Sequence, residues 1–187
     1  MNLIKVFLVI LLITILTGCS TLYIPVSSEE VFISEGYGVI KTEDFILAVS
    51  NKYWIKDPQE LTDYFITFKI SIKNLSSEKI IIYPEDINLI DENGNQYDIV
   101  LPEEVMSLLV PEEILFDQFN QFEQQDDQVY ETWKESKNNL IMDTYNFGYT
   151  LPNAQKTGYI FFPKLKSKNQ FCKIVFKDLE IDFIREE

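Results

Sequence analysis

The sequence predicts a mainly β protein, an antiparallel β-sandwich with one helical insertion at about residues 102–148. Three observations support this prediction. Short segments of alternating apolar and polar residues recur along the chain, turn residues separate them, and the helical patterns gather in one stretch. A parallel α/β sheet would need helices between successive strands, so the clustering of the helices disfavours it.

The first eighteen residues have the layout of a secretory signal peptide. Lys5 precedes a run from Val6 to Leu16 that is apolar except for Thr14, and small residues follow it. The run is about half the roughly 20 apolar residues of a membrane span, which disfavours a transmembrane anchor. An ordinary cleaved signal is the main alternative, because Gly18 would also suit a simple signal peptidase.

The sequence Leu-Thr-Gly-Cys at Leu16–Cys19 resembles the lipobox of bacterial lipoproteins. This resemblance implies that residues 1–18 are removed, that the Cys19 thiol carries diacylglycerol, and that the new amino terminus often receives a further acyl chain such as palmitate. Two or three chains anchor a protein stably where one does not. The expected partner of Cys19 is therefore the membrane. Because Ser20 is not aspartate, we expect the periplasmic face of the outer membrane if the cell has one, and otherwise the outer face of the cell membrane.

Residues 19–37 are expected to form a lipidated tether that becomes an edge strand, and residues 38–187 the sandwich domain. The clearest alternation runs from Tyr64 to Lys73, with Tyr64, Ile66, Phe68, Ile70 and Ile72 on one face. The other predicted strands are Phe45 to about Trp54, Lys79–Tyr83, Ile87–Ile90, Tyr97–Val100, Thr157–Phe162 and Phe171–Phe176. Leu179, Ile181 and Phe183 follow after a phase slip at Asp178, which predicts a bulge or bend.

Proline followed by two glutamates predicts helix starts at Pro102 and Pro111, because proline suits the first helical position and glutamates suit the positive end of the helix dipole. A third helix is expected from about Asp126 to Ile141. The aromatic residues of this insertion have two interpretations: packing against the sandwich, which we favour, or a partner-binding face. The candidates for the partner-binding face are Phe119, Phe122, Tyr130 and Trp133.

Charge and composition limit the classes of function. The chain has 30 acidic and 16 basic residues and a net charge of -14, which disfavours nucleic acid and direct docking on an anionic bilayer. Residues 102–148 hold eleven acidic and two basic residues, so a partner of this segment would present a basic protein surface. The chain has no histidine, which removes the commonest general base and the usual nitrogen ligand of zinc. We expect no cofactor and no metal.

Three other kinds of candidate site have simpler structural interpretations. If Cys19 is lipidated, Cys172 is the only thiol left, and the alternation around it predicts a buried, reduced cysteine with no disulfide. The segment Asp91–Asn95 offers carboxylates around Gly94, but it lacks EF-hand spacing and predicts a hairpin turn. Paired carboxylates at Glu103/Glu104, Glu112/Glu113 and Asp126/Asp127 are explained by helix capping rather than catalysis.

Several motifs resemble a family of immunoglobulin-like domains of unknown function in bacterial surface lipoproteins. They are a strand that ends in Lys73-Asn74, then Pro84 and Asp86, the Asp91-to-Gly94 hairpin that ends in Tyr97, and a late strand that begins at Gly158. The resemblance implies an immunoglobulin-like sandwich, an extracytoplasmic location and a binding role, and it supplies no catalytic residues. Residues 102–148 depart from the family pattern.

We therefore predict a lipid-anchored extracytoplasmic module for binding or envelope assembly, with an unknown ligand and no enzymatic activity. One alternative is a carboxylate-dependent hydrolase acting on cell-wall or glycan material. A second alternative is a structural envelope lipoprotein.

Overall fold

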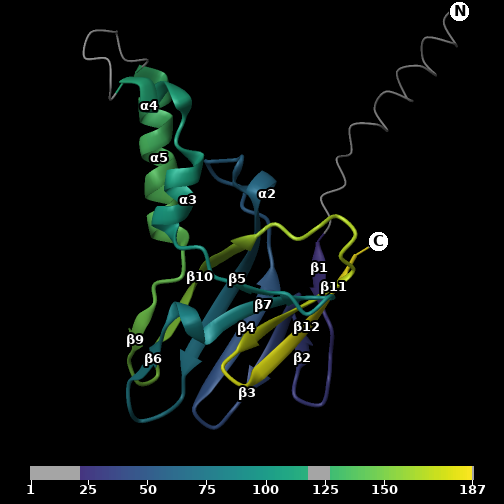
Figure 1. Cartoon of the computed structure of the whole chain (residues 1–187). Coiled ribbons are helices and arrows are strands. Elements are labelled where there is room, and N and C mark those ends of the chain that lie inside the picture. The colour runs from purple at the N-terminus through teal and green to yellow at the C-terminus, as the bar shows by residue number, and fades with distance from the viewer. Residues whose placement is uncertain (1–21, 118–126, 187) are drawn as a thin grey trace, which may run out of the picture.

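Two antiparallel sheets pack face to face, and helices project from one end of them (Figure 1). The computed structural model of the chain describes residues 22–117 and 127–186. In these residues the predicted mainly β sandwich with a helical insertion is confirmed.

The first sheet has the strand order β1-β12-β11-β7-β8 and the second the order β10-β5-β4-β3-β2. The strands of the first sheet are β1 (Tyr23–Pro25), β7 (Ile87–Asp91), β8 (Gln96–Asp98), β11 (Phe171–Phe176) and β12 (Leu179–Arg185). Those of the second sheet are β2 (Phe32–Ser34), β3 (Tyr37–Lys41), β4 (Phe45–Asn51), β5 (Phe65–Asn74) and β10 (Gln155–Pro163). A separate pair joins β6 (Ile80–Ile82) to β9 (Gly148–Thr150), and a 3-10 turn, η1 (Pro84–Asp86), precedes β7.

The edge strands β1 and β2 come from the segment that the sequence assigned to the tether. Tyr23 pairs with Arg185 on β12, and Phe32 pairs with Val39 on β3. The sheets therefore already include residues upstream of position 38.

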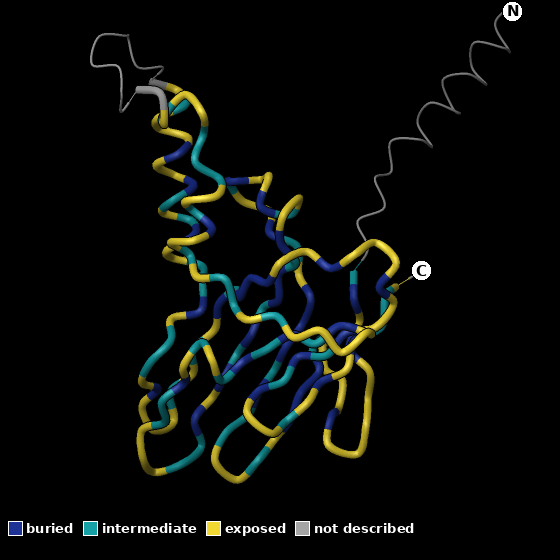
Figure 2. The backbone as a smooth tube through the Cα atoms, in the orientation of Figure 1, coloured by how far each residue is buried: buried dark blue, intermediate teal, exposed yellow. Residues whose placement is uncertain are grey.

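The main core lies between the two sheets, where burial alternates along the strands (Figure 2). Phe68 of β5 meets Phe183 of β12 edge-to-face, with 5.1 Å between the ring centroids. Other fully buried members are Val49, Ile70, Ile72, Ile87, Leu89, Ile160, Phe162, Phe176 and Ile181. Burial alternates from Phe68 to Asn74 on β5 and along the whole of β11, which is the period-2 pattern of strands that have one face in the core.

Two local features differ from their prediction. Tyr64 was expected on the inner face of a strand, but it belongs to the short helix α2 (Leu61–Tyr64) and is 62% exposed. Helix α2 forms because the fully buried Leu61 is held by tertiary packing, so β5 begins one residue later. At the phase slip, where a bulge or bend was expected, the chain forms a tight hairpin: Phe176 pairs with Leu179, and Lys177 has a φ of 54°.

The Asp91–Asn95 segment is the predicted hairpin turn between β7 and β8. The Asp91 carboxylate accepts hydrogen bonds from the amides of Asn93 and Asn95, both at 2.9 Å, and from the Tyr97 hydroxyl. The Asn95 side-chain hydrogen bond is the main cause that lowers the Asp91 pKa. Only Gly94 adopts a positive φ, 80°, as glycine does readily in such turns.

The insertion consists of α3 (Pro102–Leu109), α4 (Glu112–Asp117) and α5 (Asp127–Asp143). Pro102 is the first residue of α3, and Glu104 accepts a hydrogen bond from the Leu101 amide at 3.0 Å, as its early glutamates predicted. Pro111 directly precedes α4 rather than opening it. Helix α5 follows its predicted bounds closely.

Candidate functional site

The helical insertion is fixed to the sandwich by a second, smaller apolar cluster. Val105 of α3 and Leu140 of α5 are both fully buried in it. The sandwich contributes Trp54, Leu61, Phe65 and Phe161. The Trp54 ring meets the Phe161 ring edge-to-face at 5.8 Å. The base of the insertion is therefore part of the folded core.

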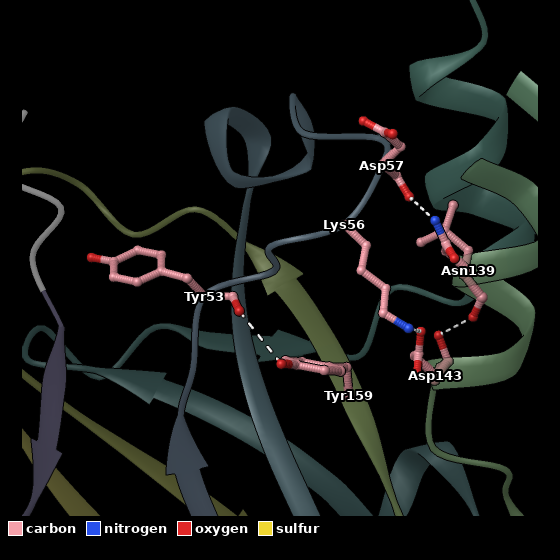
Figure 3. Close-up of polar contacts among 8 residues, drawn as sticks. Tyr53, Lys56, Asp57, Asn139, Asp143 and Tyr159 are labelled. Carbon is pink, nitrogen blue, oxygen red and sulfur yellow. Dashed lines mark hydrogen bonds and ion pairs between the residues drawn. The ribbon is translucent and has the colours of Figure 1, made fainter. Parts of the chain in front are cut away.

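Polar contacts tie the segment after β4 to the last turns of α5 (Figure 3). The Lys56 ammonium lies 2.5 Å from the Asp143 carboxylate. The Asn139 side-chain amide donates to the Asp57 carbonyl at 3.1 Å, and the Tyr159 hydroxyl donates to the Tyr53 carbonyl at 3.4 Å. Residues 53–57 are thus held against β10 and α5, which positions the segment that follows them.

A groove of about 600 Å³ opens between that following segment and the helices. We call it the helical groove. One wall is formed by residues 57–64, and the other by the α3–α4 connection and α5. Its lining residues are Asp57, Pro58, Glu60, Tyr64, Leu108, Leu109, Val110, Pro111, Glu112, Gln128, Val129, Thr132, Trp133 and Ser136.

Apolar side chains are exposed at the helical groove. Tyr64 of α2 is 62% exposed and Leu108 of α3 is 67% exposed, although both line a concave surface. Trp133 is only 6% exposed and forms the inner surface of the same groove. Exposed apolar side chains gathered in a concavity are a feature of interaction sites.

The groove is acidic. Asp57, Glu60 and Glu112 line it, and its lining contains no lysine or arginine. A ligand that is apolar at its centre and positively charged at its rim would complement this surface.

The structure separates the four aromatic residues that were predicted to bind a partner. Trp133 lines the helical groove and is buried. Tyr130 is 45% exposed and does not line the groove. Phe119 and Phe122 lie outside the described residues.

Sequence reasoning missed Tyr64 and Leu108. Leu108 could have been found, because it lies three residues after the buried Val105 on a short helix whose apolar face continues at Leu109. Nothing near Tyr64 in the sequence indicates that residues 57–64 would meet a helix more than 40 positions later. That wall of the groove depends on tertiary packing.

A second concavity, which we call the N-terminal cleft, lies where the described chain begins and has a volume of about 660 Å³. Tyr23, Tyr53 and Phe65 supply its aromatic surface. Its charged residues are Asp63, Lys164, Lys166 and Arg185.

Cys172 is 4% exposed and reduced, as predicted. Its strand neighbours are Asp91 on β7 and Phe183 on β12. Burial is the main cause that raises the pKa of the thiol, and the carboxylates of Asp182 and Asp91 add to it. The thiol therefore stays protonated at neutral pH. Cys19 lies outside the described residues.

In residues 22–117 and 127–186, no group of three or more histidine, cysteine, aspartate or glutamate side chains could hold a metal ion. No helix within these residues is long and apolar enough to cross a membrane.

Comparison with known proteins adds two structural likenesses. A secreted protein of Mycobacterium tuberculosis, MPT63, shares 8% identity at a TM-score of 0.39, over 76% of this chain and 89% of that protein. A functionally unknown protein of Listeria monocytogenes EGD-e shares 12% identity at a TM-score of 0.35, over 84% of this chain and 72% of that one. No protein-family model and no curated protein matches the sequence. Neither likeness indicates a function.

Proposed function

We propose that the chain is an extracytoplasmic binding module, anchored by lipid at Cys19, whose helical groove holds an apolar and basic segment of a partner protein in the cell envelope. The observation that carries the proposal is the exposure of Tyr64 and Leu108 inside an acidic concavity. The Leu16–Cys19 motif supports the anchor and the location.

The groove is preorganised for this role. The Lys56–Asp143 ion pair, the Asn139 contact and the second apolar cluster hold its two walls in place, so a ligand would not have to order them. Complete burial of a leucine side chain contributes roughly 1.5–3 kcal/mol, and most of this remains to be gained at Leu108.

Site-specific photocrosslinking in intact cells tests the proposal. A photoreactive amino acid at Leu108 is compared with one at Leu151, which is similarly exposed, 63% against 67%, but follows β9 outside the groove. We expect an adduct only from position 108. Mass spectrometry of that adduct should identify a segment with lysine or arginine next to apolar residues. Equal adducts at both positions, or an acidic crosslinked segment, would contradict the proposal.

The same charge substitution at Leu108 and at Leu151 tests whether binding depends on the groove. Leu108→Lys should weaken recovery of the same crosslinked partner from a reporter position at Tyr64 by more than about tenfold, because it replaces an apolar contact with a positive charge against a basic ligand. Leu151→Lys makes the same chemical change away from the groove and should leave recovery unchanged.

The hydrolase alternative makes a different prediction at the same groove. Its carboxylates Glu60 and Glu112 would act on a glycan, so Glu60→Gln and Glu112→Gln would abolish release of cell-wall fragments while leaving Leu108 adducts in place. The structural-lipoprotein alternative predicts that neither the carboxylates nor Leu108 affects any binding or turnover.

A further inference from the structure

The described chain begins at a fixed position on one end of the sandwich. The Leu22 carbonyl accepts a hydrogen bond from the Glu186 amide at 2.8 Å, and Tyr23 then enters β1. Only three residue steps separate Leu22 from Cys19, and an extended chain covers at most about 11 Å over that length. A lipid on Cys19 would therefore hold this end of the sandwich close to the membrane.

A lysine-rich loop lies at the same end. The Tyr23 hydroxyl donates to the Asn169 carbonyl at 2.9 Å, and the Arg185 amide donates to the Gln170 carbonyl at 2.9 Å. Lys164, Lys166 and Lys168, which precede these contacts, are exposed. We call residues 164–168 the lysine loop.

The lysine loop belongs to a basic stretch of an otherwise acidic chain. Residues 144–177 contain six lysines and no aspartate or glutamate. Lys164 donates to the Thr62 carbonyl at 2.8 Å, while Lys166 and Lys168 form no ion pair with any residue of 22–117 or 127–186.

Carboxylates also occur at this end and weaken the positive field. Asp63 lines the same cleft as Lys164, the Glu92 carboxylate accepts the Gln170 amide at 2.7 Å, and Glu186 follows Arg185. The strongly acidic helices stand at the same end of the sandwich as the lysine loop but to one side of it (Figure 1). Helix α2 adjoins both, because the Lys164 amide donates to the Tyr64 carbonyl at 2.9 Å and Tyr64 lines the helical groove. The two parts would respond oppositely to a negative surface.

We propose that the lysine loop lies against the anionic phospholipid headgroups of the membrane that carries the Cys19 lipid, and that this contact tilts the acidic helices away from the bilayer. This inference rests on the proposed lipid anchor. The net charge of -14 disfavours such docking for a free molecule. An anchored chain is held at a high effective concentration at the surface, so a modest local attraction is enough to select an orientation.

The test uses the mature lipidated protein in vesicles. A fluorophore is placed on Ser167→Cys, next to the loop lysines, or on Glu135→Cys, an exposed position of α5, each in a Cys172→Ala background. Nitroxides on the lipid headgroups quench nearby fluorophores. In phosphatidylcholine vesicles that contain phosphatidylglycerol, we expect position 167 to be quenched about fivefold more than position 135, the effect of one lysine at such a surface. High salt or pure phosphatidylcholine should remove the difference.

Two double variants have the same charge change. Lys166→Glu with Lys168→Glu should abolish the preferential quenching. Lys41→Glu with Lys73→Glu should retain it, because both of these exposed lysines flank Ile46 of β4 at the opposite end of the second sheet.

Equal quenching at positions 167 and 135 on an acylated chain would overturn the loop contact and leave the anchor standing. Mass spectrometry reports the anchor separately. A chain without lipid on Cys19 would overturn the anchor and, with it, the membrane position of the loop.

Discussion

Gly158 of β10 leaves room for the backbone of residues 144–145, where the chain returns from the insertion to the sandwich. A Cβ atom built at this position would lie 2.3 Å from the Tyr145 amide nitrogen, because residues 144–145 cross β10 there and Tyr145 donates to the Tyr159 carbonyl at 2.8 Å. Gly158→Ala should lower the free energy of unfolding by about 1–3 kcal/mol through overpacking.

Urea unfolding measures this loss. The control is Thr157→Ala, at the exposed neighbouring position of the same strand, which should change stability by less than about 0.5 kcal/mol. Equal stability of the two variants would mean that the crossing segment can move away without cost.

Cys172 is predicted to be unreactive in the native state. It is buried, its pKa is raised mainly by burial, and the thiolate is the reactive form of cysteine. Native protein should therefore react with a thiol reagent only after unfolding. Cys172→Ala should fold and cost about 1 kcal/mol, the usual size of a point-mutant effect. Fast labelling of the native protein would contradict this placement of the strand.

The raised pKa also predicts a pH dependence. The unfolded thiol ionises near its ordinary pKa while the folded thiol remains protonated, so its contribution to stability is present below the unfolded pKa and is lost as the pH rises above it. Stability should decline above about pH 9, and Cys172→Ala should reduce that decline.

The helical insertion provides a prediction about α5. Leu140 is fully buried in the second cluster, whereas its neighbour Ile141 is 63% exposed. Leu140→Ala should cost about 2–5 kcal/mol, the range for a leucine deleted from a core. Ile141→Ala removes a similar side chain from the surface and should cost less than about 0.5 kcal/mol. Similar effects in urea unfolding would mean that the insertion does not pack on the sandwich.

Because of this packing, removal of the whole insertion would also damage the core of the sandwich. A short glycine-serine loop in place of residues 102–148 would remove Val105 and Leu140 and expose Trp54, Leu61 and Phe161 of the sandwich. Deletion is therefore expected to destabilise the domain, and a loss of binding after deletion would not identify a binding surface. Point variants at Leu108 avoid this difficulty because that side chain is exposed.

The elements differ in how well the sequence predicts them, and the difference has a physical cause. A strand with one buried face must alternate, so β5 and β11 follow from the sequence. Glutamates near a helix start satisfy local amides, so α3 follows as well. Helix α2 and the groove wall beside it depend on contacts between residues 57–64 and α5, and no local pattern encodes such a meeting.

The charge distribution also has one part that the sequence predicts and another that only the fold determines. The acidity of residues 102–148 is visible in the sequence, and so is the basic stretch of residues 144–177. Only the fold places the lysine loop beside Tyr23 and Arg185, at the end where the chain leads back to Cys19. A net charge alone led to the expectation that the molecule avoids an anionic bilayer, whereas the distribution of charge allows one face to approach it.

The anchor itself is tested by Cys19→Ser. Lipid transfer needs the thiol as its nucleophile, and a serine hydroxyl is far less nucleophilic, so the variant should remain an uncleaved precursor without lipid. The mass of the N-terminal peptide and incorporation of labelled palmitate measure the two outcomes. Cys172→Ala is the matched control, because it removes the other of the two cysteines and should leave cleavage and labelling unchanged. Normal cleavage of Cys19→Ser, together with an unlabelled wild type, would favour an ordinary signal peptide and would leave the binding role of the helical groove to be judged on the crosslinks at Leu108.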